Sequence, residues 1–398
     1  MIDSRKEHEM KKWKHAAAFG MAGVMLAVSA FPILASSPEF ARTPEEWARL
    51  EDNVLEYEEI EDLIAEYNTA VQVNQLDLNE FKRKYGNTKD DVSAKYRDMA
   101  NEIYASVDYP DSDDPMYGIM VSAVLTAELQ AKNMLQQADD NLEDSEIIYL
   151  GYKQSEKTLV TVAQSNMVNY AKGLLQIEQA ELALSQARSA MASVNTKRAN
   201  GLATQADVLS AQEALMTAER NIESARTNAE NVRQKLLVML GWQYDARPEI
   251  RNIPAADMHR IEGMNPQADK DRALENNFSL KINQKKLANA QTANTIDSLE
   301  KTIKDNEQKI GSSLVTNYQN VLTARLAYEQ AAAELDVEMR NLHSLEINYQ
   351  QGNASRIQLE NQQFAVRSKQ LAVQIADLNL FQTMETYDWA VNGLASAS

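Results

Sequence analysis

The sequence predicts an all-α fold of two tandem long helical hairpins, with little or no β-structure. None of the 8 prolines falls within 116–247 or 267–398, and the 398 residues include only 12 glycines. Apolar residues recur at alternating steps of three and four, as in the seam of a coiled coil. A block that ends one helix and starts the next occurs twice. Long paired helices are therefore expected in both halves of the chain.

The clearest seam belongs to the helix expected between Thr204 and Gly241. Its members are Val208, Ala211, Leu215, Ala218, Ile222, Ala225, Ala229, Val232, Leu236 and Met239. Because these side chains share one face, a partner helix must cover them. The last helix of the chain carries two such stripes, which predicts two helical neighbours. They are Leu359/Val366/Val373/Leu380 and Ile357/Phe364/Leu371/Leu378.

Each long hairpin is expected to turn at a glycine that is followed by a helix-capping hydroxyl. Gly201 can take the left-handed conformation that ends a helix. Thr204 then offers an N-cap, and Asp207 three residues later completes a capping-box-like pair. Gly352 and Ser355 repeat this arrangement 151 residues further on. Two such tips predict two long hairpins.

The elements are expected in a definite order. In the first repeat an ascending helix runs to about Ala105, an acidic turn covers 106–115, and a descending helix covers roughly 117–199. The second repeat turns near Asn294, unless one helix continues unbroken to Gln350. The expected segments are a flexible acidic lead-in at 37–59, the first repeat at 60–243, a proline-containing linker at 244–266, the second repeat at 267–393 and a tail at 394–398.

The first 36 residues have the pattern of an export segment. Lys11, Lys12 and Lys14 come before an apolar run over 16–35. This order is typical of a signal peptide. The run is also about as long as the ~20 residues that span a bilayer, so an uncleaved N-terminal membrane anchor is the alternative. In both cases the body of the protein is expected outside the cytoplasmic membrane.

Charge and residue types argue against several classes of function. The 40 Lys and Arg against 58 Asp and Glu give a net charge of −18, and nucleic acid needs a basic face. The chain has no cysteine, so it has neither disulfides nor thiolate metal sites. His259 and His343 lack the neighbouring ligands that a metal requires. Without a nucleophile elbow or a phosphate-binding glycine loop, neither an enzyme nor a cofactor is expected.

The duplicated tips resemble those of a known family. Each tip reads Gly-x-x-Thr or Gly-x-x-Ser, and a helix with Ala-Gln or Gln-Gln follows a few residues later. This unit, repeated in the second half of the chain, resembles the tips of the TolC-type outer membrane efflux proteins. The resemblance covers roughly residues 55–393. It implies a passive conduit for exported molecules, assembled as a homotrimer in the cell envelope. The implied partners are a periplasmic adaptor, or membrane fusion protein, and an ABC or other export transporter.

The resemblance also assigns roles to the tips, which meet the adaptor in this family. The implied docking residues are Gly201, Leu202, Thr204, Asp207, Gly352, Asn353 and Ser355. Family members tend to narrow the aperture with acidic residues just past the second tip. Gln358 and Asn361 hold those positions here as candidate aperture lining, so an acidic gate is not expected.

The chain departs from the family in the connections between ascending and descending helices. Family members place membrane strands there, and such strands need about 9–11 residues of alternating pattern. Neither 106–115 nor the region near Asn294 has one, so we expect a divergent member without these strands. A host envelope without an ordinary outer membrane is our hypothesis for their loss. The alternative function is an exported coiled-coil spacer that conducts nothing, whereas an adaptor is disfavoured because no β-rich domain is visible.

Overall fold

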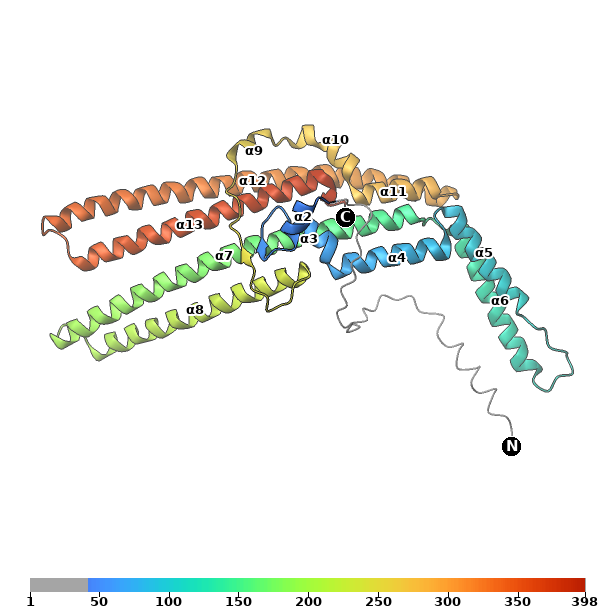
Figure 1. Ribbon diagram of the computed structural model, residues 1–398, viewed down its shortest axis with the longest axis horizontal. Coiled ribbons are helices and arrows are strands. Elements are labelled where there is room, and N and C mark those ends of the chain that lie inside the picture. Colours follow the sequence, from blue (N-terminus) through green and yellow to red (C-terminus); the bar gives the residue numbers. More distant parts are fainter. Residues whose placement is uncertain (1–41, 398) are drawn as a thin grey trace. The chain divides into compact units, whose positions relative to one another are not determined.

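The structure is a computed structural model that describes residues 42–397, and its fold is all-α as predicted (Figure 1). From Pro44 onward the chain forms one compact unit, which is described here. Its helices are α2 Pro44–Leu50, α3 Ile60–Tyr67, α4 Thr69–Tyr85, α5 Lys89–Ala105, α6 Tyr117–Asp140, α7 Ser145–Ala199, α8 Gln205–Met239, α9 Met258–Gly263, α10 Pro266–Asn276, α11 Phe278–Asn289, α12 Ala293–Gln350 and α13 Arg356–Trp389. Two short strands, β1 Val54–Leu55 and β2 Glu249–Ile250, and a π-helix, η1 Ala390–Leu394, complete the list.

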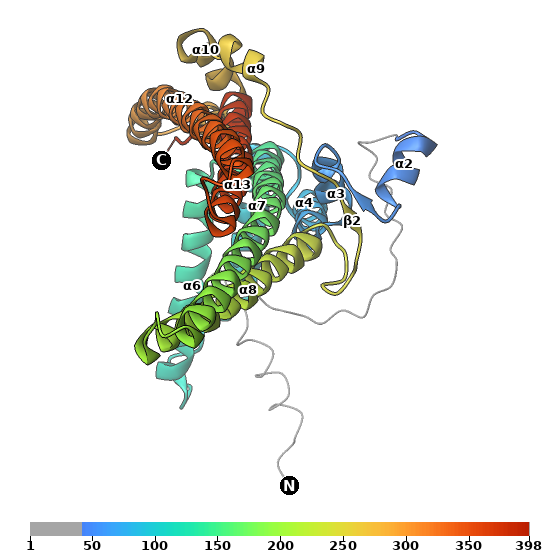
Figure 2. The same cartoon turned by 90° about the vertical axis from the view of Figure 1, so that its left-hand side faces the viewer.

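Two long hairpins dominate this unit, α7 with α8 and α12 with α13 (Figures 1 and 2). All of the predicted seam residues of α8 are buried or half-buried, from Val208 beside the turn to Leu236 near the far end. The apolar seam therefore packs α8 on α7 as predicted. Helix α13 contacts both α12 and α7, which confirms the two neighbours expected from its two stripes.

Several helices that were expected to be continuous are interrupted by capping side chains. The ascending helix of the first repeat is three helices, because Asn68 caps α4 and Thr88 caps α5. The descending helix is divided into α6 and α7, and Asp144 caps α7. In the second repeat Asn277 caps α11 and Thr292 caps α12, so the single unbroken helix does not form. Short polar side chains that bind main-chain N–H groups end helices without any proline.

A third, shorter hairpin consists of α5 and α6, which pack on each other. The loop at 106–116 joins them, where an acidic turn was predicted. The base of this hairpin is fixed where Ser145 donates its main-chain N–H to the carbonyl oxygen of Asn87 at 3.1 Å.

The expected flexible lead-in is ordered over its described part. It contains α2 and β1, and Leu50, Leu55 and Tyr57 are buried in a hydrophobic core. Strand β1 lies parallel to β2 of the linker, with Val54 opposite Glu249. A strand of two residues is too short to show a period of two, which is why the sequence pattern did not reveal it. The export segment at 1–36 lies outside the described residues.

Two hydrophobic cores lie at the ends of the long hairpins opposite their tips. One gathers residues of α3, α7 and α8, and the other gathers residues of α10, α12 and α13. Ala395, in the segment expected to be a tail, is 5% exposed and belongs to the second core. Within residues 42–397, no helix combines the length and the apolar character needed to span a bilayer.

Candidate functional site: the hairpin tips and the contacts between the hairpins

The first tip ends α7 with a Schellman motif around Gly201. The N–H of Leu202 donates to the carbonyl oxygen of Lys197 at 2.8 Å, and that of Gly201 donates to Arg198 at 2.9 Å. Gly201 has φ +72°, and a Cβ there would meet nothing within 4 Å. The left-handed backbone, and not crowding, is therefore the reason for glycine.

A complete capping box starts α8. The N–H of Asp207 donates to Thr204 Oγ1 at 3.2 Å, and the N–H of Thr204 donates back to Asp207 Oδ2 at 2.7 Å. The Thr204 hydroxyl also donates to Asp207 Oδ2 at 2.7 Å. These hydrogen bonds from Thr204 lower the pKa of Asp207, because they stabilise its charged form. Asp207 is thus a structural part of the turn.

The second tip has the same main-chain geometry. The N–H of Asn353 donates to Asn348 at 2.8 Å, and that of Gly352, with φ +78°, donates to Tyr349 at 3.0 Å. Ser355 forms a capping box with Gln358, whose side-chain oxygen accepts from both the N–H and the hydroxyl of Ser355 at 2.8 Å. The Gln358 oxygen is therefore already engaged by the cap.

Every residue expected at the tips is exposed in this chain. These residues are Gly201, Leu202, Thr204, Asp207, Gly352, Asn353, Ser355, Gln358 and Asn361. Leu202 has the largest exposed apolar side chain among them, at 77%. Neither its main-chain hydrogen bonds nor the capping box requires a leucine at this position.

Polar contacts between α7 and α13 bring the two tips to the same end of the unit. Near the tips, Ser189 Oγ donates to Glu360 Oε2 at 3.1 Å. About three turns further from the tips, Arg367 forms an ion pair with Glu178. As residue numbers rise along α7 they fall along α13, so the two helices are antiparallel, and the end of α7 and the start of α13 both lie at the tips.

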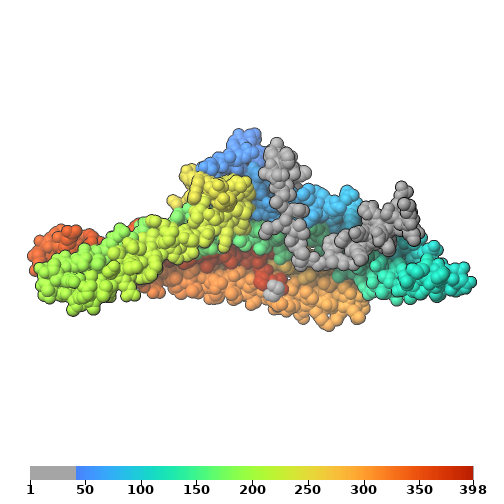
Figure 3. Space-filling model, turned by 90° about the horizontal axis from the view of Figure 1, so that it is seen from below, coloured from blue at the N-terminus to red at the C-terminus, as the bar shows by residue number. Residues whose placement is uncertain are grey.

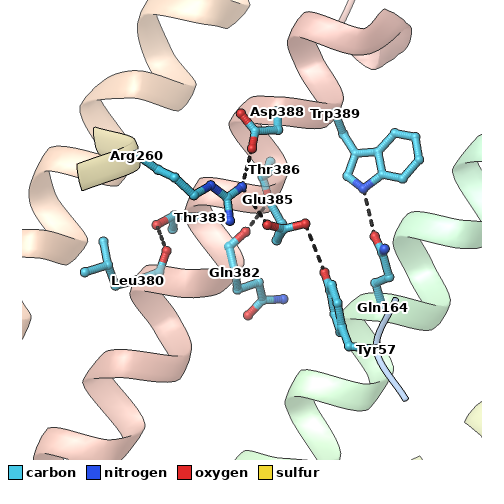
Figure 4. A network of polar contacts seen from close by, with 10 residues as sticks. All are labelled: Tyr57, Gln164, Arg260, Leu380, Gln382, Thr383, Glu385, Thr386, Asp388 and Trp389. Atoms are coloured by element: carbon cyan, nitrogen blue, oxygen red, sulfur yellow. Dashed lines mark hydrogen bonds and ion pairs between the residues drawn. The ribbon is translucent and has the colours of Figure 1, made fainter. Parts of the chain in front are cut away.

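The same row of polar contacts continues toward the cores. Lys172 Nζ donates to Gln382 Oε1 at 2.6 Å, and Gln382 Nε2 donates to Ser165 Oγ at 2.7 Å. Burial lowers the pKa of Lys172, since its charged form loses solvation. Further on, Trp389 Nε1 donates to Gln164 Oε1 at 2.7 Å (Figure 4).

At the core end, residues from the lead-in and the linker hold α13 in place. Arg260 of α9 binds Glu385 at 2.8 Å and also pairs with Asp388, while the Tyr57 hydroxyl approaches Glu385 Oε2 at 3.4 Å (Figure 4). Burial and the neighbouring Glu385 carboxylate raise the pKa of Tyr57, so its hydroxyl stays protonated. This end of α13 is therefore fixed on two sides.

The interhelical contacts were not predicted from the sequence. Glu178, Ser189, Glu360 and Arg367 lie between apolar seam positions, and no spacing rule distinguishes them from solvated residues. Their pairing depends on which faces two separate hairpins present to each other. Within residues 42–397 no group of three or more His, Cys, Asp or Glu residues is arranged to hold a metal ion.

Comparison with known proteins supports the fold and gives no match by sequence. No protein-family model and no curated protein matches the chain. The outer-membrane channel OprN aligns with a TM-score of 0.54 and 11% identity over 87% of this chain and 92% of its own. The Campylobacter jejuni CmeC outer membrane channel aligns with a TM-score of 0.50 and 10% identity over 95% of each chain. The fold is thus that of the TolC-type helical tunnel, as the tips suggested.

Proposed function

We propose that this chain, which has the fold of the TolC-type channels, is a subunit of a passive export conduit in the cell envelope. The observation that carries the proposal is the pairing of α7 with α13, which places two equivalent tips at one end of two long hairpins. One subunit supplies only part of a tunnel wall. Copies are needed to close it, and three are proposed, as the family resemblance implies.

The difference between contacts within and between hairpins supports an opening movement at the tips. Within the first hairpin, α8 packs on α7 through an apolar seam, and such burial resists separation. Between hairpins, the Arg367–Glu178 pair has side chains that are 43% and 41% exposed. A half-exposed ion pair contributes only about 0–1 kcal/mol. Each hairpin can therefore move as a stiff body while the contacts near the tips separate.

The tips are proposed as the docking surface for an adaptor protein. Schellman motifs and capping boxes hold both turns in one conformation before binding, which limits the entropy lost on docking. Leu202 offers an exposed apolar anchor, and Asn353 offers a polar one at the equivalent place of the second tip. The adaptor would link the conduit to an energised transporter of the inner membrane.

Particle mass and shape test the conduit. Light scattering and negative-stain imaging of the purified full chain are expected to show three copies around a central hole. A monomer, or a solid rod at high protein concentration, contradicts the conduit and leaves the exported spacer as the function.

Photocrosslinking in cells tests the docking role of the tips. A crosslinker at Leu202 is expected to capture an adaptor protein, identified by mass spectrometry. A crosslinker at Met216, which is 52% exposed on the shaft of α8, is the matched control. If position 216 captures the adaptor as efficiently as position 202, the tips are not its docking surface.

A further inference from the structure

The α5–α6 hairpin carries a surface that its own packing does not use. Val124, Ala131 and Ala138 of α6 recur every seven residues and are buried, and Val92 and Ala100 of α5 are buried as well. These small residues form the contact between the two helices. On the face seen in Figure 3, the teal surface of this hairpin forms one end of the unit.

Large apolar side chains remain exposed on the distal part of this hairpin, residues 98–131, which we call the arm tip. Leu125 and Leu129 are each 59% exposed and, four residues apart, share one face of α6. The exposed apolar and aromatic residues of the arm tip are Tyr104, Tyr109, Met116, Tyr117, Ile119, Leu125 and Leu129. Seven such side chains within 34 residues mark the arm tip as a candidate interaction surface.

The charge of the arm tip has one sign. Its acidic residues are Asp98, Glu102, Asp108, Asp111, Asp113, Asp114 and Glu128, and it contains neither lysine nor arginine. The nearest basic residues in sequence, Arg97 and Lys132, lie just outside it. Seven acidic residues and no basic one give residues 98–131 a net charge of −7, next to their exposed apolar side chains.

One hydrogen bond orders the loop of the arm tip against α6. The Tyr109 hydroxyl donates to Glu128 Oε1, although the tyrosine side chain is 66% exposed. Glu128 lies three residues after Leu125, so the hydrogen bond holds the phenol ring near the face of α6 that carries Leu125. Tyrosine is enriched among the residues that anchor binding surfaces, and exposed leucines beside it supply apolar area for a partner to cover.

From this combination we propose that the arm tip is a docking surface for a basic protein segment that carries apolar side chains between its lysines or arginines. Charge complementarity selects this occupant over the others. A second copy of the arm tip would bring like charges together, and anionic lipid or nucleic acid would be repelled. The acidic residues would raise the association rate. The leucines and the tyrosine, once the partner covers them, would stabilise the complex.

A synthetic peptide probes this surface directly. The probe is an amphipathic helix of lysine and leucine, and its two reference peptides replace either leucine by serine or lysine by glutamate. The purified full chain is expected to bind the lysine–leucine peptide at least about tenfold more tightly than either reference. Binding should weaken as salt is raised, because the charges are exposed.

Two pairs of variants separate the arm tip from the general acidity of the chain. Leu125→Ser with Leu129→Ser, and Asp111→Asn with Asp113→Asn and Asp114→Asn, should each weaken peptide binding about tenfold. The matched controls lie on exposed positions of α8: Leu209→Ser with Met216→Ser, and Glu213→Gln with Glu219→Gln and Glu223→Gln. The controls should stay within about twofold of the wild type.

Three results would overturn the proposal. The first is an equal loss of peptide affinity in the arm-tip variants and the α8 variants. The second is equal affinity of the chain for the lysine–leucine and lysine–serine peptides. The third is binding of the arm tip to phosphatidylglycerol vesicles and not to the peptide. Circular dichroism of each variant shows whether it is folded. These outcomes do not depend on whether the chain forms a conduit.

Discussion

Asn277 donates its side-chain amide to the main-chain oxygen of Ala395, 118 residues further along the chain, at 2.9 Å. The same side chain accepts the N–H of Leu280 and so caps α11. Asn68 makes the equivalent pair of contacts in the first repeat, capping α4 and donating to the carbonyl oxygen of Met239 at 2.8 Å. In both halves, one asparagine starts a helix and ties it to the end of the hairpin.

Asn277→Ala is expected to lower the free energy of unfolding by roughly 2 kcal/mol or more. The variant loses a helix cap, at about 1 kcal/mol, and leaves buried main-chain groups without a partner, at about 1–3 kcal/mol. Thr292→Ala is the control, since it removes the exposed cap of α12 and should cost only about 1 kcal/mol. Urea unfolding followed by circular dichroism measures both. Equal losses of unfolding free energy in the two variants would show that the contact with Ala395 does not contribute to stability.

Two glycine substitutions should act in opposite directions. Gly393 has φ +117°, and a Cβ there would lie 2.8 Å from the carbonyl oxygen of Asn276, so Gly393→Ala should be strongly destabilising. Gly151 lies within α7 and a Cβ there would meet nothing within 4 Å, so Gly151→Ala should stabilise by about 0.5–1 kcal/mol. Thermal unfolding should show a lower melting temperature for Gly393→Ala and a higher one for Gly151→Ala than for the wild type. A tolerated Gly393→Ala would contradict the close approach of η1 to α10.

Glu230 makes a pH-dependent contribution to stability. Hydrogen bonds from Arg233, which is almost fully buried, lower the pKa of Glu230 from 4.5 to about 2. Because the folded-state pKa is depressed, the stabilisation is present above about pH 4.5 and is lost as the pH falls toward 2. The difference in melting temperature between wild type and Glu230→Gln should therefore shrink over this range. A difference that is constant from pH 6 to pH 2 would contradict the pairing.

The Arg367–Glu178 pair should control the separation of the tips more than the stability of the chain. Arg367→Glu is expected to change the unfolding free energy by less than about 1 kcal/mol, because both side chains are partly exposed. The distance between spin labels at Leu202 and Asn353 should nevertheless become broader and longer. The chain has no cysteine, so both labels can be introduced without removing one.

The charge-reversed double variant, Arg367→Glu with Glu178→Arg, is the control for this effect. It should restore the wild-type distance distribution, because opposite charges again face each other. If the single variant leaves the distribution unchanged, the pair does not link the hairpins in solution.

The tips were predictable because their chemistry is local. A left-handed glycine, a hydroxyl three residues later and a partner three residues beyond that define the turn without help from the rest of the fold. The structure accordingly shows the expected caps at Thr204 and Ser355. The engagement of Gln358 in its cap was not foreseen, since the residue had been considered only as aperture lining.

The helix breaks at Asn68, Asp144 and Asn277 were less accessible to prediction. Asparagine and aspartate also occur on solvated helix surfaces. Whether they cap a new helix depends on whether another segment packs against the chain at the break and stabilises its change of direction. The break at Asn277, for example, is stabilised by Ala395, which lies at the opposite end of the repeat.

The sequence by itself determined the all-α class, the two long hairpins, their turns and the apolar seam of α8, because each follows from periodicity or from contacts within a few residues. Only the tertiary structure decided which hairpin faces touch, where the lead-in docks and how α5 and α6 form a separate arm. Those features depend on polar pairs such as Ser189 with Glu360, and on strands of two residues. Such contacts leave no period in the sequence, since their partners are set by the packing of distant segments.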